Sequence, residues 1–292
     1  MRSRTSHAAF AALAVYLSTA CGAGSTGQPP GVLDTTESEE PPAALEVSQT
    51  FFIPGEVMRF QLSLRGVVGG ETTVAVGLPG EIDGRRAIIL RSRVESAGVV
   101  ALIREIRDEV ITWIDLDEGI PIRLHADVKF GKKESIIDTD FNGGEPGAFA
   151  IEYERKGQTK RTYLQAMPPD QSAHDIHSIM GVVRAWDAQP GTHAYFYVLA
   201  GRRLWLNTIR LTERETIRTA LGRFPAIRID GIAKRMTRQL AENTRKKPRE
   251  FTVWISDDAD RVPLRVIAKT EYGEVRAELI DYDRPERRVS TR

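Results

Sequence analysis

Long stretches of alternating apolar and polar residues dominate this chain from about residue 51 onward. The alternation is regular over residues 58–64 and 122–130, and it returns over residues 264–268 and 275–279. A period of two places successive side chains on opposite faces of a β-strand, so each strand has one apolar face and one wet face. Strands of this kind must cover their apolar face, which predicts a sheet that curls on itself.

Turn signals separate these stretches at short intervals. Glycine-containing pairs that favour tight turns occur at residues 69–70, 79–80, 83–84, 142–143, 190–191 and 272–273. Many short strands joined by such turns are typical of an antiparallel sheet.

The strand pattern also repeats within the chain. Residues 113–115 (WID) are followed by residues 121–124 (PIRL), and residues 254–257 (WISD) by residues 263–266 (PLRV). In each copy a proline begins the second strand, where its missing N–H costs least. We therefore expect two similar β-meanders, which arose by duplication or by convergent needs of the hairpins.

One segment breaks the period of two. Between Ser172 and Trp186, apolar residues recur at the spacing of one helix face. Ser172 or Asp175 can cap the start of this helix, and residues 190–191 (PG) prevent its continuation. The sequence thus predicts a mainly β fold, a curved antiparallel sheet or half-open barrel made of two meander halves, with one central helix.

The N-terminus has the features of an export signal. Two arginines precede ten apolar residues at 8–17, and small residues lead to Cys21, the only cysteine. Ten residues are too few to span a bilayer, which needs about 20, but they suit a signal-peptide core. The segment resembles a bacterial lipoprotein signal, with Ser18 where that signal usually has the leucine that is found here at Leu17. The alternative is an ordinary secreted protein cleaved near Ala20.

These features divide the chain into four parts. We expect a lipoprotein signal peptide over residues 1–20, a flexible tether over 21–49, a β-rich domain over 50–284 and a C-terminal tail over 285–292. The tether is rich in glycine, proline and glutamate and too poor in large apolar groups to order itself.

The signal and the charge indicate where the protein acts. A lipid on Cys21 would anchor it to a membrane of the cell envelope. Gly22, which follows in place of aspartate, favours the periplasmic face of the outer membrane, by analogy with enteric lipoproteins. Cleavage would leave 39 basic and 40 acidic side chains. The mature chain would therefore have no net positive charge to attract nucleic acid.

Three groups of polar residues could carry chemistry, and each has a simpler explanation. His174 and His177 share a helix face and could hold a metal, but we expect polar surface residues and no metal. Asp175, His177 and Ser178 are triad residue types, but neighbours on one helix cannot adopt the relay geometry. The acidic residues at 257–260 lack the glycine and distal glutamate of an EF-hand, so a solvated turn is expected.

Aromatic residues gather at Tyr195, Phe196, Tyr197 and Trp205. They could pack in the core, or they could line a groove that binds an apolar, lipid-like ligand. Our ligand-binding candidates are Tyr195, Tyr197 and Trp205. The basic residues at 245–249 (RKKPR) are typical of a solvated loop, and they could also meet anionic headgroups or a partner.

Several of these motifs resemble one exported bacterial family, domain of unknown function 3108. The resemblance rests on residues 52–56 (FIPGE), 66–70 (GVVGG), 175–178 (DIHS), 254–258 (WISDD) and 263–265 (PLR). It covers roughly residues 50–283. It implies a periplasmic, β-rich domain with a curved sheet, and it brings neither an established activity nor catalytic residues.

We therefore expect a non-enzymatic envelope lipoprotein that binds an apolar ligand or an envelope protein. It would use no cofactor. The alternative is a periplasmic enzyme, hydrolytic or metal-dependent, that uses His174 and His177. The chain has no nucleophile elbow and no glycine-rich phosphate loop, which favours the non-enzymatic role.

Replacing Cys21 tests the lipid anchor. Cys21→Ser should move the protein from membranes to the soluble fraction, because each buried methylene of the acyl chains contributes roughly 0.8 kcal/mol to membrane binding. Cell fractionation measures this, with mass spectrometry to establish whether the signal was cleaved. A cleaved variant that still sediments with membranes in high salt would show that the lipid is not the anchor.

Overall fold

We describe a computed structural model of the chain, which covers residues 42–47, 49–103, 105–143, 147–270 and 272–285. The predicted signal peptide and Cys21 lie outside the described residues. Within the described part, no helix is long and apolar enough to cross a membrane.

The described residues form seventeen strands and two helices. The strands of the first part of the chain are β1 (Ala43–Ala44), β2 (Val57–Leu64), β3 (Val67–Val76), β4 (Gly80–Ile82), β5 (Arg85–Ser96), β6 (Ile106–Asp115), β7 (Pro121–Phe130), β8 (Lys133–Asp140), β9 (Ala148–Arg155) and β10 (Arg161–Ala166). Those of the second part are β11 (Ala173–His174), β12 (His193–Ala200), β13 (Arg203–Thr219), β14 (Gly222–Arg235), β15 (Arg249–Ser256), β16 (Pro263–Thr270) and β17 (Gly273–Asp283). The helices are α1 (Gly98–Ile103) and α2 (Ile176–Ala185).

The strands belong to one continuous, mostly antiparallel sheet, as the alternation predicts. Pairing runs from β12 in sequence order to β17, passes from β17 to β2, and continues through β3, β5, β6, β7, β8 and β9 to β10. The short strands β1 and β11 lie parallel to the free edge of β12, and β4 pairs with β5. The described strands β10 and β12 do not pair, so the sheet is curved but not closed.

The sequence repeat is also a structural repeat. In the β6–β7 hairpin Trp113 faces Arg123, and a bulge separates this pair from Ile114 and Pro121. The β15–β16 hairpin has the same arrangement, with Trp254 opposite Arg265 and a bulge before Ile255 and Pro263. The prediction of two meander halves is therefore confirmed, as β2–β8 and β12–β17.

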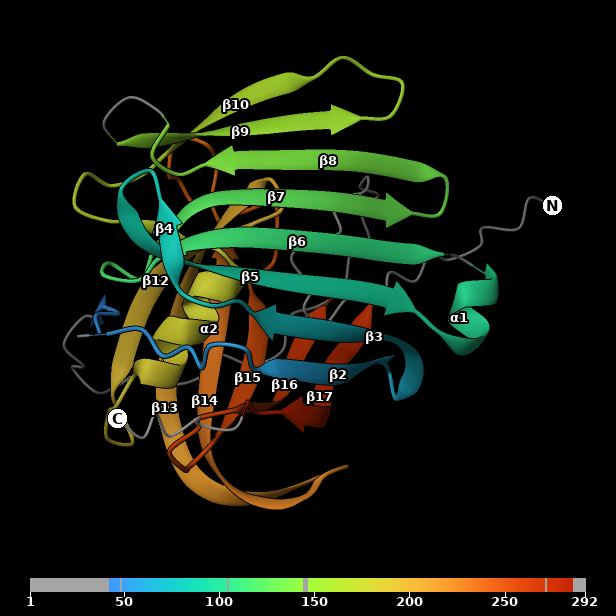
Figure 1. The fold of residues 1–292 in the computed structure, drawn as a ribbon, viewed down its shortest axis with the longest axis vertical. Coiled ribbons are helices and arrows are strands. Elements are labelled where there is room, and N and C mark those ends of the chain that lie inside the picture. The colour runs from blue at the N-terminus through green and yellow to red at the C-terminus, as the bar shows by residue number, and fades with distance from the viewer. Residues whose placement is uncertain (1–41, 48, 104, 144–146, 271, 286–292) are drawn as a thin grey trace, which may run out of the picture.

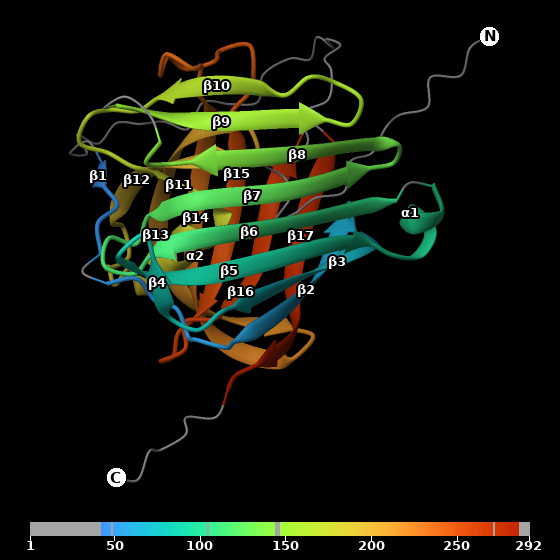
Figure 2. The same ribbon diagram turned by 45° about the horizontal axis from the view of Figure 1, so that its top comes forward.

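The two meanders lie across each other with α2 between them. In Figure 1 the strands β5–β10 run across the view and β13–β17 run steeply to them behind, and Figure 2 shows the same crossing from above. Ile179 and Val182 of α2 pack in one buried cluster with apolar residues of β12–β15, among them Phe196, Ile209, Ile227 and Ile255. The helix thus covers part of the inner face of the sheet.

Helix α2 starts later than its sequence pattern suggests. It begins at Ile176 because Ala173 and His174 pair with β12 as strand β11. Asp175 is the N-cap: its side chain accepts a hydrogen bond from Ser178 N at 2.8 Å, and Ser178 Oγ accepts one from Asp175 N at 3.0 Å. The short helix α1, which connects β5 and β6, was not expected from the sequence.

The folded part also begins earlier than residue 50. Strand β1 lies inside the segment predicted to be a tether, and Leu45 N donates to Tyr195 O at 2.8 Å. Leu45 is buried in the cluster beneath α2. A two-residue strand and one apolar side chain form too short a pattern to be recognised in a sequence that otherwise reads as a linker. The predicted start of the domain at residue 50 is therefore too late.

A buried ion pair fixes α2 against the rest of the fold. The Arg184 guanidinium contacts both Glu56 carboxylate oxygens, at 2.5 and 3.1 Å, and both side chains are fully buried. Arg184 also donates to the carbonyls of Asp260 and Arg261 in the β15–β16 turn, at 2.8 and 3.0 Å. Tyr282 of β17 donates to Glu56 at 3.2 Å. One helical arginine thus connects the segment before β2 with the last strands of the second meander.

A close contact supports the same arrangement. The Phe52 ring lies on α2 at Gly181, where a Cβ would overlap it, and Phe51 N donates to Gly181 O at 3.0 Å. The Phe51 ring in turn lies 4.9 Å from the Arg184 guanidinium carbon. The segment before β2 is therefore packed along the helix.

Breaking this ion pair should be costly. Arg184→Leu leaves the Glu56 carboxylate buried without its cation, so the free energy of unfolding should fall by about 3–5 kcal/mol. The double variant Arg184→Leu, Glu56→Leu should lose clearly less than the two single variants together. Denaturant unfolding measures both values.

The exposed pair Arg59–Asp281, at 3.7 Å, is the matched control. Arg59→Leu should change stability by less than about 1 kcal/mol. An Arg184→Leu variant as stable as Arg59→Leu would contradict the role given to the buried pair.

Candidate functional site

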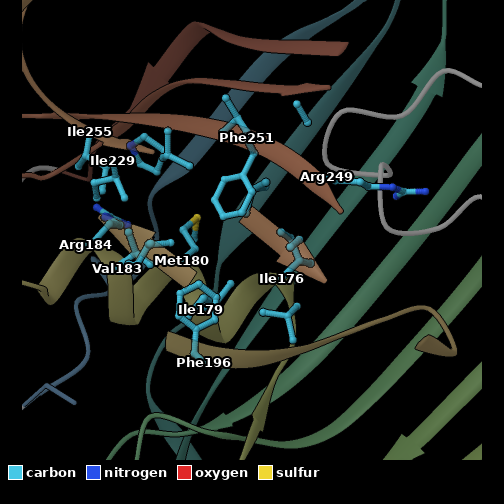
Figure 3. A pocket seen from close by; sticks show the side chains of 18 of the residues that line it. Ile176, Ile179, Met180, Val183, Arg184, Phe196, Ile229, Arg249, Phe251 and Ile255 are labelled. Carbon is cyan, nitrogen blue, oxygen red and sulfur yellow. The ribbon is translucent and has the colours of Figure 1, made fainter. Parts of the chain in front are cut away.

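An apolar cavity lies between α2 and the inner face of β12–β16, and Phe60 of β2 and Val74 of β3 also line it. Its volume is about 140 Å³. Figure 3 shows Ile176, Ile179, Met180 and Val183 of α2 on one side, and Phe251 of β15 directed toward them from the other. All of the side chains that line it are apolar except for two arginines, one at each end.

The sequence explains why space is left here. The helix contributes side chains at a spacing of three and four residues, which places them on one face. On the sheet side, Gly231 lies opposite Phe251 in the β14–β15 pair, and a Cβ at Gly231 would overlap the phenyl ring. The ring therefore lies across the strand pair and forms part of the cavity wall. Neither Phe196 nor Phe251 was singled out as a ligand contact from the sequence.

The two ends of the cavity differ in charge. At one end Arg184 is neutralised by Glu56 in the buried ion pair. At the other end Arg249 is half-buried, and in Figure 3 its guanidinium points away from the apolar side chains. Its guanidinium carbon lies 4.6 Å from the Trp205 ring centroid. A polar group can thus be accommodated only at the Arg249 end.

The predicted ligand-binding aromatics lie around this cavity and do not line it. Tyr195 and Tyr197 are on the face of β12 opposite to Phe196, with ring centroids 6.4 Å apart, and line a more polar pocket beside β1 and β11. Trp205 is on the cavity side of β13 and packs with Ala200, Ala233 and Phe251. Ligand binding by the three aromatics stays a prediction.

The two candidate histidines are buried, which corrects the expectation of surface residues. His174 is 8% exposed and lies in β11, and His177 is 1% exposed in the first turn of α2. Thr112 of β6 donates to Asp175 Oδ2 at 2.5 Å and lies 2.8 Å from His177 Nδ1. Since the threonine hydroxyl has a single hydrogen, His177 Nδ1 must donate to it.

Burial keeps both rings neutral. Desolvation lowers the pKa of His174 to about 4 and lowers the pKa of His177, while the charge of Asp175 opposes both changes. His177 Nε2 is buried without a hydrogen-bond partner among the described atoms, so a proton there would create an unpaired buried charge. The hydrogen-bond partner of His177, Thr112, lies more than sixty residues earlier in the chain, which the helix pattern alone cannot indicate.

Ser178 belongs to the cap of the helix. Ser178 is fully buried, and its hydroxyl lies 3.2 Å from His174 Nδ1 and caps the helix through Asp175 N. Within the part of the chain that the structure describes, no three His, Cys, Asp or Glu side chains are grouped to hold a metal ion. The arrangement secures the start of α2 against β6.

The acidic loop at 257–260 forms the hairpin turn expected for it. Asp258 Oδ1 accepts hydrogen bonds from Ser256 Oγ at 2.7 Å and from the backbone N–H groups of Asp260 and Arg261 at 3.0 and 3.1 Å. Asp257 pairs with Arg214. The Asp258 carboxylate thus holds the turn together, and the Asp257 carboxylate is paired with an arginine.

A buried carboxyl on β6 was not noticed in the sequence. Asp108 is 4% exposed and lies between Val94 of β5 and Val128 of β7 on the inner face. Its Oδ1 has no hydrogen-bond partner among the described atoms. Desolvation raises the pKa of Asp108 to about 7, and the backbone hydrogen bond from Lys129 only partly opposes this.

Comparison with known proteins identifies a family and a fold. A family model described as "Protein of unknown function (DUF3108)" matches residues 59–280. No curated protein matches the sequence. The fold is similar to that of a β-barrel-like protein of domain of unknown function DUF1849 from Brucella abortus, with a TM-score of 0.52 and 9% identity over 81% of this chain and 100% of that one.

Two further solved structures are more distant. One is described as an exported protein with a YmcC-like fold from Bacteroides fragilis, and the other as a lipoprotein from Parabacteroides distasonis. Each has a TM-score of 0.36 and 8% identity over 80% of this chain and 99% of its own. Of the three structures, the Brucella protein supports the barrel-like fold, because the other two are too dissimilar in structure.

The pKa of Asp108 predicts a pH-dependent stability. Its folded pKa of about 7 exceeds the ordinary value of 3.8, so its contribution to stability is lost as the pH rises from about 4 to 7. Asp108→Asn should therefore raise the free energy of unfolding at pH 8 by up to ~4 kcal/mol, because one unit of pKa corresponds to about 1.4 kcal/mol. Near pH 4 the gain should vanish.

Denaturant unfolding at pH 8, 6 and 4 measures this difference. His174 acts in the opposite sense, since its lowered pKa removes stability as the pH falls from 6.5 toward 4. Wild type and variant share that histidine, so their difference isolates Asp108. Asp170→Asn, at an exposed position before β11, is the control and should change little. If Asp108→Asn raises the free energy of unfolding at pH 8 by no more than the control does, then the Asp108 carboxylate is not charged and buried at that pH.

Proposed function

The chain belongs to the DUF3108 family of proteins of unknown function, and we propose that it is a non-enzymatic lipoprotein of the cell envelope that binds an apolar, lipid-like ligand. The binding site of this proposal is the cavity beneath α2. Cys21, at the end of the signal-like segment, would carry the lipid that anchors the protein to the membrane, and the following residues would hold the domain away from its surface.

The observation that carries this proposal is the apolar cavity itself. An engineered cavity of 150 Å³ lined by Leu, Ile and Phe stays dry and binds benzene. The cavity here has a similar volume and lining. It holds one aromatic ring or a comparable length of alkyl chain, and the rest of a longer ligand would lie along the same inner face toward the Arg249 end. Transfer of the chain from water stabilises the complex by about 0.8 kcal/mol per methylene.

The chemistry of the described residues supports binding over catalysis. The histidine, aspartate and serine residues that could form a reactive group are buried and cap α2. The large apolar residues exposed on the surface are spread over different strands and turns: Val67, Val68, Leu78, Ile89, Ile136, Leu164, Leu221 and Ile232. Scattered residues of this kind favour a small apolar ligand over a protein partner.

Filling the cavity tests the proposal. The neutral dye N-phenyl-1-naphthylamine should bind the wild-type protein with enhanced fluorescence. Ile229→Trp places an indole in the cavity and should weaken dye binding about tenfold or more, because the space for the ring is lost. Native mass spectrometry of protein prepared from its own envelope should show a bound lipid in the wild type and little in the variant.

Ile232→Trp is the matched control. Ile232 lies on the same strand, 42% exposed on the outer face. This variant should bind the dye like the wild type. Circular dichroism verifies that both variants are folded. Equal loss of binding in the two variants, or wild-type binding in folded Ile229→Trp, would exclude the cavity as the site. A ligand-free protein would favour an envelope protein partner.

A further inference from the structure

Five arginines gather where strands β12–β15 end near the cavity. The arginine cluster consists of Arg202, Arg203, Arg235, Arg238 and Arg249, each partly exposed. Arg202 comes from the β12–β13 turn and Arg203 from the start of β13. Arg235 ends β14, Arg238 lies in the loop after it, and Arg249 begins β15. Residues from three separate strand ends thus meet at one place.

Strand register places three of these arginines on the cavity side of the sheet. Arg249 lies opposite Ala233, which lines the cavity, and Arg235 lies opposite Trp205. Directly opposed residues share a face, and so do residues two apart on one strand. Arg203, two residues before Trp205, is therefore on this face as well. The cluster continues the inner face just past the Arg249 end of the cavity.

The positive charge of four members of the cluster is not neutralised in the part of the chain that the structure describes. No described acidic side chain forms an ion pair with Arg202, Arg203, Arg235 or Arg238. The Nε atoms of Arg203 and Arg235 are buried and have no hydrogen-bond partner in this part of the chain. Desolvation and the neighbouring arginines lower the pKa of both guanidinium groups. Partly desolvated like charges without a counter-ion are unfavourable, so an anion placed among them would be strongly attracted.

Aromatic rings hold the guanidinium groups in position. The guanidinium carbon of Arg202 lies 3.8 Å from the Tyr153 ring centroid, and that of Arg238 lies 4.2 Å from the Tyr163 centroid. Arg249 lies over Trp205 in the same way. Such contacts fix a cation without neutralising it. The cluster is therefore preorganised for an anion.

We propose that the arginine cluster binds the anionic headgroup, a phosphate or carboxylate, of an amphiphile whose apolar chain occupies the cavity. This inference rests on the proposed function and specifies its ligand. Guanidinium groups form bidentate hydrogen bonds with both anions. At the opposite end of the cavity the charge of Arg184 is already neutralised by Glu56, so the cluster is the end that attracts an anionic headgroup.

Three probes with shared parts separate headgroup from chain. The full-length protein is titrated with dodecyl phosphate, with 1-dodecanol and with inorganic phosphate, and displacement of N-phenyl-1-naphthylamine or calorimetry reports binding. Dodecyl phosphate should bind at least tenfold more tightly than dodecanol, and inorganic phosphate should bind far more weakly than dodecyl phosphate. The advantage of dodecyl phosphate should decrease with salt, because the cluster is partly exposed.

Variants assign the effect to the cluster. Arg203→Gln with Arg235→Gln should weaken dodecyl phosphate binding about tenfold or more, and should leave dodecanol and the dye unchanged. Arg210→Gln is the matched control, because Arg210 is exposed on the outer face of β13. It should bind all probes like the wild type. Unchanged dye binding also shows that the double variant is folded.

Each remaining result opposes the proposal in a recognisable way. If the dye and dodecanol bind but the phosphate adds nothing, the cavity function stands and the headgroup site is wrong. If inorganic phosphate binds as tightly as dodecyl phosphate, the cluster is a site for free anions and the amphiphile is wrong. If no neutral probe binds, the proposed function fails as well. A double variant that keeps full affinity for dodecyl phosphate excludes these arginines.

Discussion

A sheet with one apolar face is stable only when that face is covered, and in this fold part of the cover is held by a single buried ion pair. Arg184 extends from α2 to Glu56 before β2, and the same two groups contact the β15–β16 turn and Tyr282 of β17. Both meanders are therefore tied to the helix at one point. Since separated buried charges are far more costly than paired ones, the position of α2 is tightly fixed. The shape of the cavity beneath it follows from that position.

Local patterns predicted the elements well and their partners poorly. The period of two identified strands such as β2 and β7, and the repeated prolines Pro121 and Pro263 marked equivalent strands in the two meanders. Helical spacing identified the buried face of α2. The surroundings of His177 could not be predicted, because they include Thr112 from a strand far away in sequence. Leu45 was missed for a related reason, since its burial depends on the free edge of β12.

The candidate site shows the same division between local and distant information. The helical wall of the cavity, Ile176 to Val183, was visible in the sequence as an apolar face. The opposite wall depends on the register of seven strands, β2, β3 and β12–β16, which a single sequence does not reveal. The arginines are a stronger example, because Arg203, Arg235 and Arg249 belong to unrelated local motifs and share a face only through pairing. One basic residue of the group, Arg249, lay in a stretch recognised as basic.

The pairing of β17 with β2 determines the order in which this protein can fold. Ala277 lies beside Leu62, 215 positions earlier in the chain. Each meander consists mainly of neighbouring strands, which pair with little loss of chain entropy, whereas this junction closes a very long loop. A chain that emerges from a translocation channel with its N-terminus first must therefore keep the edge of β2 unpaired until almost all of the domain has been delivered. An open strand edge invites aggregation, so a chain delivered in this way depends on fast completion of the second meander.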